Sequence, residues 1–397
     1  MNVVTLLFWL SAGVLIYVFI GFPLILILRG LLLPRPYKQD DITPSVSLII
    51  AAYNEAGVIE EKLKNSLALD YPPDRLEIIV ASDGSTDGTD EIVKRYAERG
   101  VRLLALPRGG KIPALNTASS QAKGEILVFS DANSMYAPDA LRALVRPFAD
   151  PKVGGVAGNQ CYLPANKQSL GGIGEQLYWN FDQYLKEIGS RAGNAISATG
   201  SMYAIRRSLF EPIPTGVTDD FMISTNVIKR GYRLVYAPDA RTYEPVSSDT
   251  SMEFKRKVRV ITQGLQAVML HRQLLNPFRY GFYAVQLFSH KLLRRLMAIP
   301  LIVLFVTSLL LVSTSLFYEI AALAQSAFYG LALIGIVIER VGPAYPRPLK
   351  PLFRMLSIPY FFCAVYISSL VAVLNLLRGN RIELWEPQRA DPKVGDT

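Results

Sequence analysis

The sequence predicts an α/β catalytic domain on a doubly wound, mostly parallel sheet, joined to transmembrane α-helices. Three observations support this prediction. Long apolar runs without charged residues lie near both ends of the chain, and no such run occurs between residues 44 and 243. Within that middle part, short apolar runs alternate with polar stretches of helical periodicity. This alternation is typical of a parallel sheet with helices on both faces.

The composition excludes several classes of protein. Of the 397 residues, 50% are hydrophobic and 19% are charged, which argues against a disordered chain. Two cysteines argue against a disulfide scaffold or a cysteine zinc module, and two histidines exclude a His-rich metal site. The net charge of +9 is concentrated beside the apolar runs. Anionic membrane lipid therefore explains the charge better than nucleic acid does.

The first apolar run predicts an N-terminal transmembrane helix within residues 1–33. Val3 to Leu28 contains no Asp, Glu, Lys or Arg. Its length suffices to cross a bilayer core of about 30 Å, and it is too long for a signal-peptide core. Arg29, Arg35 and Lys38 follow directly, and positive charge favours the cytoplasmic side. We therefore expect the N-terminus outside the cell and the chain from residue 40 inside.

Residues 44–250 form the predicted cytoplasmic catalytic domain. About 200 residues are enough for a well-filled core. The four apolar runs expected to form buried strands are Val46–Ala52, Ile78–Ser82, Val101–Leu104 and Ile126–Ser130. The four stretches expected to form helices between them are Val58–Leu67, Asp90–Glu98, Pro113–Ala122 and Asp139–Phe148.

Three further apolar runs predict transmembrane segments within residues 297–377. They are Met297–Phe317, Ile320–Ile338 and Met355–Leu377. The short connection between the first two predicts an antiparallel hairpin. Strict alternation of four spans places the tail, residues 378–397, opposite the catalytic domain, yet the tail is basic and so favours the inside. A half-inserted segment and a different number of spans both remain open.

Residues 251–296 are expected to form interfacial amphipathic helices. In Phe254–His271, apolar residues recur every three or four positions among basic ones, which is typical of a helix lying in the lipid headgroup plane. An ordinary packed helix of the soluble domain is the alternative. The residues of this apolar face are Phe254, Val258, Ile261, Leu265 and Val268.

Polar clusters follow the predicted strands, where doubly wound sheets bind their ligands. Tyr53 and Glu55 follow the first strand, and Asp83 begins a glycine-containing stretch after the second. The pattern is not a dinucleotide fingerprint, because no G-x-G-x-x-G follows the first strand. Turns and helix caps are the structural alternative for each cluster alone.

Two other clusters suit phosphate and metal. Lys111 follows two glycines just before a predicted helix, so its ammonium and the helix amides favour a phosphate. Asp131 and Asn133 directly follow an apolar strand, and such oxygens can hold Mg²⁺ or Mn²⁺ against a diphosphate. A solvated lysine and a strand-end turn are the respective alternatives.

Taken in order, these clusters resemble the family-2 glycosyltransferases, which have a glycosyltransferase-A fold. The membrane-embedded branch, with the cellulose, chitin, hyaluronan and poly-N-acetylglucosamine synthases, is the most similar, and the resemblance covers roughly Pro44 to Gln266. It implies that Tyr53, Glu55 and Asp83 contact the uridine of a UDP-sugar. By the same resemblance Lys111 meets the diphosphate, and Asp131-Ala132-Asn133 stands at the D-x-D metal motif.

Two downstream motifs extend the resemblance. Thr199-Gly200-Ser201 is similar to the small-residue motif that lines the acceptor site, which implies acceptor contacts for Gly200 and Ser201. Thr218-Asp219-Asp220 is similar to the T-E-D motif, which implies that Asp219 lies at the acceptor and that Asp220 is the catalytic base. Displacing a nucleotide from a sugar requires a base near the acceptor hydroxyl. Capping of the following helix is the alternative role for both carboxylates.

The sequence departs from the family at two places. Asn133 replaces the second metal carboxylate, so its amide oxygen brings no charge. Processive synthases carry Q-x-x-R-W on the interfacial helix, and the matching stretch here has Arg256, Arg259 and Val260. Arg256 and Arg259 can neutralise phosphate, and Arg259 is expected to bind the nucleotide-sugar. The aromatic residue is missing, which puts processivity in question.

The sequence thus predicts an inverting, UDP-sugar-dependent glycosyltransferase that adds sugars to a glycan hydroxyl and forms a β-linked polysaccharide. Transfer of a single sugar to a membrane lipid, such as a polyprenyl phosphate or a sphingolipid, is the alternative. A non-catalytic membrane transporter or scaffold is a minor one. The expected location is the inner cell membrane, with several spans and a cytoplasmic catalytic domain. The expected partners are the donor, the acceptor and membrane lipids.

Overall fold

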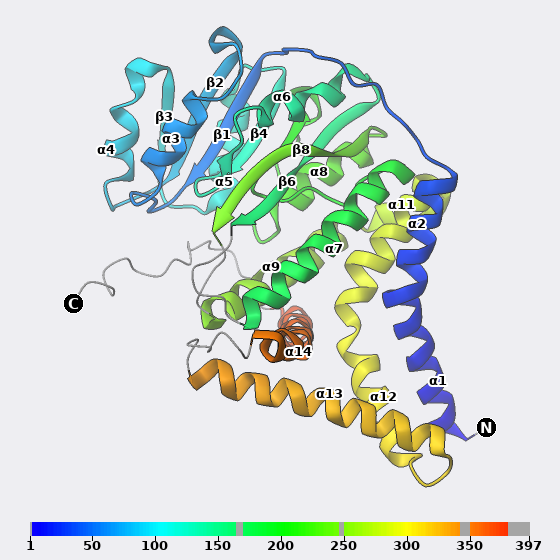
Figure 1. Cartoon of the computed structure of the whole chain (residues 1–397). Helices are drawn as coiled ribbons and strands as arrows, with labels where there is room; N and C mark the ends of the chain where they lie inside the picture. The colour runs from blue at the N-terminus through cyan, green and yellow to red at the C-terminus, as the bar shows by residue number, and fades with distance from the viewer. Residues whose placement is uncertain (1, 164–169, 246–249, 342–349, 380–397) are drawn as a thin grey trace.

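The computed structural model describes residues 2–163, 170–245, 250–341 and 350–379. An α/β domain lies at one end of the molecule, and a group of long helices lies at the other (Figure 1). The helices α7 (Leu170–Ala192) and α9 (Thr250–Leu270) lie between the sheet and the apolar helices (Figure 1).

One eight-stranded sheet organises the α/β domain. Its strand order is β3-β2-β1-β4-β7-β6-β8-β5, and β1 pairs in parallel with both β2 and β4. The four predicted strands and the mostly parallel sheet are confirmed. The strands are β1 (Val46–Ala52), β2 (Leu76–Asp83), β3 (Val101–Leu106), β4 (Ile126–Asp131), β5 (Met135–Tyr136), β6 (Val153–Leu163), β7 (Tyr203–Arg206) and β8 (Arg233–Pro245).

Helices cover both faces of this sheet. Every residue of β1 is buried, because alternate side chains enter two different cores. Ile49 packs on the face covered by α5 and α8, whereas Leu48 packs on the face covered by α3, α4 and α6. The doubly wound arrangement is therefore confirmed. These helices are α3 (Ile59–Leu67), α4 (Thr89–Lys94), α5 (Lys111–Gln121), α6 (Ala140–Val145) and α8 (Asp219–Lys229).

Among the described residues, three helices are long and apolar enough to cross a membrane: Val3–Leu32, Leu316–Glu339 and Met355–Leu377. The first consists of α1 (Val3–Ile16) and α2 (Phe22–Leu32), joined by a π-helical turn. The other two lie in α13 (Leu316–Val341) and α14 (Lys350–Leu377).

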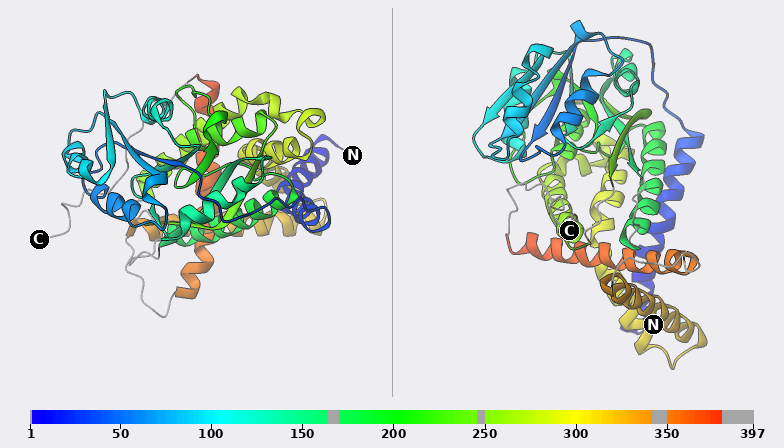
Figure 2. Two further views of the ribbon diagram at one scale, coloured as in Figure 1. Left: turned by 90° about the horizontal axis from the view of Figure 1, so that it is seen from above. Right: turned by 60° about the vertical axis from the view of Figure 1, so that its left-hand side comes forward.

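The segment predicted at Met297–Phe317 is different. Helix α12 (Ala298–Leu310) has only 13 residues and is bent by 54° from the preceding Phe282–Leu296. Pro300 explains the break, since it has no N–H to donate to the carbonyl of Leu296. Only the bent pair together is long enough to span. Helix α13 crosses α12 at a steep angle (Figures 1 and 2). The two helices still contact each other, because Gln325 donates to the Ser308 hydroxyl at 3.1 Å and the Phe305 ring packs on the Tyr329 ring.

The apolar face of α9 is covered by protein. Val258, Ile261 and Leu265 are buried against α14, where Ala372 completes the same cluster. This face is therefore buried in protein, against a helix outside the α/β domain. The periodicity correctly indicated a buried face, but α14, a candidate membrane span, is what covers it.

The polypeptide between α9 and α12 is broken into short helical pieces. A 3-10 turn and α10 (Pro277–Tyr280) precede α11 (Phe282–Gln286). A π-helical turn (Leu287–Leu292) and a 3-10 turn (Leu293–Leu296) then lead to α12. These last two turns carry Lys291, Arg294 and Arg295 toward the interior of the molecule.

Candidate active site

A cavity of about 980 Å³ lies between the carboxyl ends of the central strands and the helices α7, α9 and α14. It gathers most of the site residues predicted from the sequence, although they come from distant parts of the chain. Those that line it are Glu55, Lys111, Asp131, Asn133, Gly200, Ser201, Asp219, Asp220 and Arg259. Tyr53 and Asp83 do not line it.

Lys111 links two carboxylates at the centre of the site. Gly110, with φ of +97°, turns the chain so that Lys111 is the first residue of α5. The Lys111 ammonium donates a hydrogen bond to Asp131 Oδ1 at 2.8 Å and lies 3.2 Å from Asp219 Oδ1. Burial opposes its charge, but Asp131 and Asp219 outweigh burial and hold the pKa of Lys111 well above its ordinary value.

Asp131 and Asn133 fit a divalent cation that is shared with a substrate. Both side chains reach the cavity from the turn that follows β4. Among the described residues, no group of three or more His, Cys, Asp and Glu side chains could hold a metal ion. The protein thus offers one carboxylate and one amide oxygen, and such sites are usually completed by substrate phosphates and water.

A buried polar network holds Ser134, the residue after Asn133, in the turn that follows β4. The sequence did not predict this network. The ammonium of Lys62 donates to the Ser134 carbonyl, and the Ser134 hydroxyl donates to Glu244. Lys62 is completely buried, and burial lowers its pKa to about 7. Burial, and then the nearby charge of Asp131, raise the pKa of Glu244 to about 7. Lys62 lies in a stretch rich in charged residues, so only the fold reveals that it points inward.

Asp219 and Asp220 occupy the first turn of α8, as their alternative helix-terminal role requires. Thr218 is the residue before the helix, and the two carboxylates follow it. Asp219 also accepts a hydrogen bond of 3.2 Å from the Tyr203 hydroxyl. Burial, and then the charge of Asp219, raise the pKa of Asp220 to about 6. The helix position and the cavity position are therefore compatible, and Asp220 is tuned toward neutral pH.

Asp83 is engaged by the loop between β3 and α5. Its carboxylate accepts hydrogen bonds from the amides of Gly109 at 2.7 Å and Gly110 at 2.9 Å, and it pairs with Arg108. The Arg108 guanidinium also lies 3.5 Å from the centre of the Tyr53 ring. Tyr53, Asp83 and Arg108 thus form one cluster beside the cavity.

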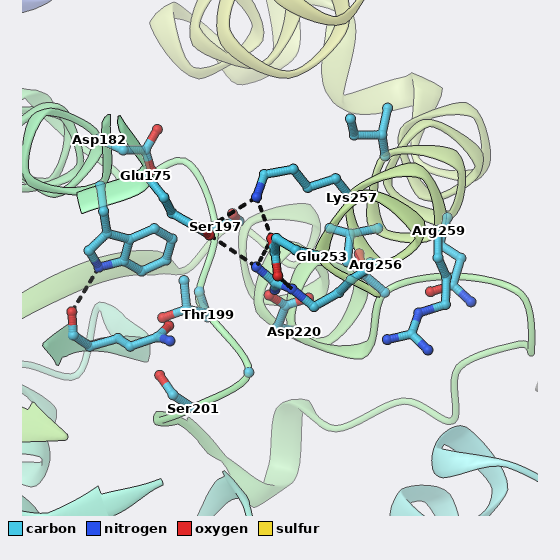
Figure 3. Close-up of a pocket in the computed structure, with 18 of the residues that line it drawn as sticks. Glu175, Asp182, Ser197, Thr199, Ser201, Asp220, Glu253, Arg256, Lys257 and Arg259 are labelled. Atoms are coloured by element: carbon cyan, nitrogen blue, oxygen red, sulfur yellow. Dashed lines mark hydrogen bonds and ion pairs between the residues drawn. The ribbon is translucent and has the colours of Figure 1, made fainter. Parts of the chain in front are cut away.

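The basic residues of α9 fall into two groups. Arg256 pairs with Glu253 at 2.7 Å and with Glu175 at 3.1 Å, and Lys257 pairs with the same two carboxylates. In Figure 3 the paired residues Glu253, Arg256 and Lys257 lie at the centre of the view, and Arg259 lies to the right of them. Arg256 is therefore held by carboxylates, and the phosphate-neutralising role expected for it is not supported.

Two hydroxyls in the cavity wall have no partner among the described residues. They are Thr199 Oγ1 and Ser201 Oγ, both buried, and both residues line the same cavity as Asp220 (Figure 3). Buried polar atoms are normally hydrogen-bonded. These two atoms are consistent with a polar ligand in this part of the cavity.

Comparison with known proteins identifies the α/β domain. Residues 47–213 match the family model for glycosyl transferase family 2. The chain contains a family-2 glycosyltransferase domain. This match, together with relatives named as glycosyltransferases, supports an enzyme.

The curated relatives that this chain resembles include synthases of a polysaccharide. A protein named poly-beta-1,6-N-acetyl-D-glucosamine synthase from Staphylococcus aureus (strain MSSA476) is 29% identical over 252 residues, which cover 62% of this chain and 59% of that one. A probable glycosyltransferase, YdaM, from Bacillus subtilis (strain 168) is 28% identical over 254 residues, covering 60% and 59%. The chain thus matches about three fifths of the length of these relatives.

One solved structure resembles nearly the whole chain. The mannosyltransferase PcManGT from Pyrobaculum calidifontis, in complex with GDP-Man and Mn²⁺, superposes with a TM-score of 0.70 at 26% identity. The match covers 94% of this chain and 100% of that one. It supports the glycosyltransferase-A-like fold together with the apolar helices, and it supports a divalent cation in the family-2 site.

Proposed function

We propose that the protein is an inverting membrane glycosyltransferase that moves a sugar from a nucleoside diphosphate to an acceptor hydroxyl. One observation carries the proposal: Lys111, Asp131, Asp219 and Asp220 come from three separate elements and face a single cavity. Three of these residues belong to motifs that resemble donor and base motifs of the family.

On the donor side, the residues supply positive charge and metal ligands. Lys111 and Arg259 would neutralise the diphosphate, and Glu55 would contact the nucleoside. Asp131 and Asn133 would hold Mg²⁺ or Mn²⁺, which when bound offsets the charge of the departing diphosphate. Arg256 has no part in this step, because it is paired with Glu175 and Glu253.

On the acceptor side, Asp220 is the proposed base. It takes the proton of an acceptor hydroxyl while the hydroxyl oxygen bonds to the anomeric carbon and the bond to the diphosphate breaks. Gly200, Ser201 and Asp219 would line the acceptor, and the unpartnered Ser201 hydroxyl would receive one of its polar groups. Attack opposite an α-linked leaving group gives a β-linked product.

The donor and the product follow from the relatives. The named staphylococcal relatives make poly-N-acetylglucosamine, which favours a UDP-sugar donor and a polysaccharide product. The mannosyltransferase structure holds GDP-Man instead, so the nucleotide has to be tested directly. We further propose a multi-pass inner-membrane protein with its catalytic domain in the cytoplasm, supported by three candidate spans and the basic residues after the first of them.

A donor panel tests the proposal. Purified protein in neutral detergent is incubated with Mn²⁺ and labelled UDP-N-acetylglucosamine, UDP-glucose or GDP-mannose, and products are separated by size. Asp220→Asn should lower transfer by at least ~100-fold while nucleotide binding persists, because only the base is lost. Asp239→Asn, which changes an exposed carboxylate on β8, is the matched control and should leave transfer unchanged. Wild-type turnover by Asp220→Asn would refute the assigned base.

A further inference from the structure

The inner half of the cavity contains a second group of charged residues, which we term the basic cluster. It comprises Lys186 of α7 together with Lys291, Arg294 and Arg295 from the turns before α12, and all four line the cavity. Lys186 is only 4% exposed, and the side chain of Arg294 is 16% exposed. None of the sequence motifs of the donor site includes these residues.

The basic cluster carries more positive charge than its neighbours neutralise. Asp182 lies 3.7 Å from Arg294 and also 3.3 Å from His290. Within the described part of the chain, no carboxylate lies within 4.0 Å of Lys186, Lys291 or Arg295. Buried cations without a close counter-ion are costly. An anion in the cavity would remove that cost.

The paired group on α9 provides an internal comparison. Arg256 and Lys257 line the same cavity, but Glu175 and Glu253 neutralise both of them. Each of these two cations thus has two carboxylate partners within 4.0 Å. The basic cluster differs because its four cations share the charges of only two carboxylates among the described residues, Asp182 and Asp220.

An apolar wall adjoins the basic cluster. It is formed by side chains of two candidate membrane spans, α14 and the N-terminal helix. On this wall the Ser369 hydroxyl is buried, with 1% of the residue exposed, and it has no partner among the described residues. The apolar residues of the wall are Phe19, Ile358, Phe361, Phe362 and Val365.

The combination of buried cations and an apolar wall suits an amphipathic anion. We propose that the basic cluster binds the phosphate of a membrane lipid, and that this lipid presents the acceptor hydroxyl to Asp220. The lipid tails lie along the wall of α14, where the membrane would be. A neutral glycan without phosphate leaves the cluster unneutralised. This inference rests on the proposed sugar transfer and names its acceptor class, a membrane lipid in place of a growing polysaccharide.

Asp220 and the basic cluster line the same cavity, so a molecule bound there can contact both. Lys291 and Lys186 both interact electrostatically with Asp220. The transfer then proceeds as described above: the lipid hydroxyl oxygen bonds to the anomeric carbon, its proton passes to Asp220, and the nucleoside diphosphate leaves. The phosphate of the lipid remains unchanged and serves only to hold the acceptor.

Binding of three probes tests the site. Detergent-purified protein is titrated with a short-chain phosphatidic acid, the matching diacylglycerol and inorganic phosphate, and binding is followed by the fluorescence of Trp179, which lies 5.8 Å from the Lys186 ammonium. Phosphatidic acid should bind at least ~10-fold more tightly than either other probe, because only it has both phosphate and tails. If diacylglycerol binds as tightly as phosphatidic acid, the cluster does not recognise the phosphate. If inorganic phosphate binds as tightly, the site does not recognise the lipid tails. Trp179→Phe should abolish the signal without changing donor binding.

A double variant locates the site. Lys291→Gln with Arg295→Gln should weaken phosphatidic acid binding by at least ~10-fold while nucleotide binding stays unchanged, which also shows that the protein is folded. Lys291→Arg with Arg295→Lys keeps the charges and should restore binding. Arg279→Gln, at an exposed residue of α10, is the control. Undiminished binding by the double Gln variant would overturn the proposal.

The acceptor role is tested in membranes that contain the protein. After incubation with labelled donor, label should appear in an organic-solvent extract and be retained by an anion exchanger. Label in a neutral lipid, or only in an aqueous polymer, contradicts the phosphate-bearing acceptor. Absence of any transfer contradicts the proposed function instead, and the binding experiments then still decide whether the lipid site exists.

Discussion

The ammonium of Lys111 lies 2.8 Å from Oδ1 of Asp131, the carboxylate proposed to hold the metal. The same ammonium lies 3.2 Å from Asp219, so one lysine neutralises a metal ligand and an acceptor-site carboxylate together. A divalent cation at Asp131 must compete with Lys111 for that oxygen. The charge balance between Asp131 and Asp219 is thus set by Lys111, and the diphosphate of a bound donor would attract the same ammonium.

Replacing Lys111 should strengthen metal binding and weaken transfer. In Lys111→Met, loss of the competing charge should tighten Mn²⁺ binding without nucleotide by about tenfold. Transfer should fall by about 100-fold, since the diphosphate loses a cation. Mn²⁺ titration by electron paramagnetic resonance measures the first effect, and Lys123→Met, at an exposed lysine after α5, is the control. Unchanged Mn²⁺ affinity would show that Lys111 and the metal do not compete.

Transfer should depend on the ionisation of Asp220. A base must be deprotonated, so the rate should rise with pH through about 6, where burial and Asp219 place the pKa of Asp220. Asp219→Asn removes the neighbouring negative charge, lowers the pKa of Asp220 and should move the acidic limb to lower pH. The measurement is kcat against pH for both proteins. If the acidic limb of the kcat–pH profile lies at the same pH in Asp219→Asn as in wild type, whatever the absolute rates, the two carboxylates are not coupled.

The same shift in pKa predicts that Asp220 destabilises the fold at neutral pH. The folded-state pKa of Asp220, about 6, exceeds its unfolded value. The contribution of Asp220 to the free energy of unfolding is therefore greatest at low pH and is lost as pH rises through 6. Asp220→Asn should therefore be more stable than wild type at pH ~7.5, by on the order of 2 kcal/mol, and equally stable at pH ~4. Thermal unfolding in detergent at both pH values provides the test. Equal Tm values at the higher pH would contradict the raised pKa.

A side chain at position 200 should disturb Asp131, the carboxylate proposed to hold the metal. A Cβ at this position would lie 3.2 Å from Asp131 Oδ2 and 3.6 Å from the Lys111 ammonium. Gly200→Ala should shift Asp131 slightly and lower transfer by about tenfold, with little change in Tm, because the displaced atoms are flexible side-chain ends. Gly264→Ala on α9, where a Cβ meets nothing within 4 Å, is the control. Full activity of Gly200→Ala would mean that Asp131 has room to move.

The central strands could be predicted because a buried parallel strand is a continuous apolar run. β1 was predicted with the bounds it has, since all seven residues are buried. The antiparallel strand β7 has only four residues, which is too short for a clear pattern. The break before α12 was missed because Pro300 near the start of an apolar run does not reveal by itself how sharply the helix bends.

The candidate site could be predicted in part for the same reason. Lys111, Asp131 and Asp220 follow strands or begin helices, where sequence position indicates the edge of the sheet. Lys62 gave no such signal, because it lies in a helix with charged neighbours on both sides. The cations at 291, 294 and 295 share one helical face before an apolar run, but that spacing equally fits a flank at the membrane surface. Only the packing of distant helices distinguishes these roles.

The loop between β3 and α5 joins Arg108, which covers the Tyr53 ring, to Lys111, which binds the Asp131 carboxylate. The Arg108 guanidinium covers the Tyr53 ring, and the following two amides are held by Asp83. A nucleobase that stacked on the Tyr53 ring would displace the Arg108 guanidinium. Arg108 is three residues before Lys111, whose ammonium donates a hydrogen bond to Asp131. If a nucleobase stacks on Tyr53 as predicted, this displacement would move the segment that carries Lys111. Nucleotide and metal should load cooperatively, each increasing the apparent affinity for the other.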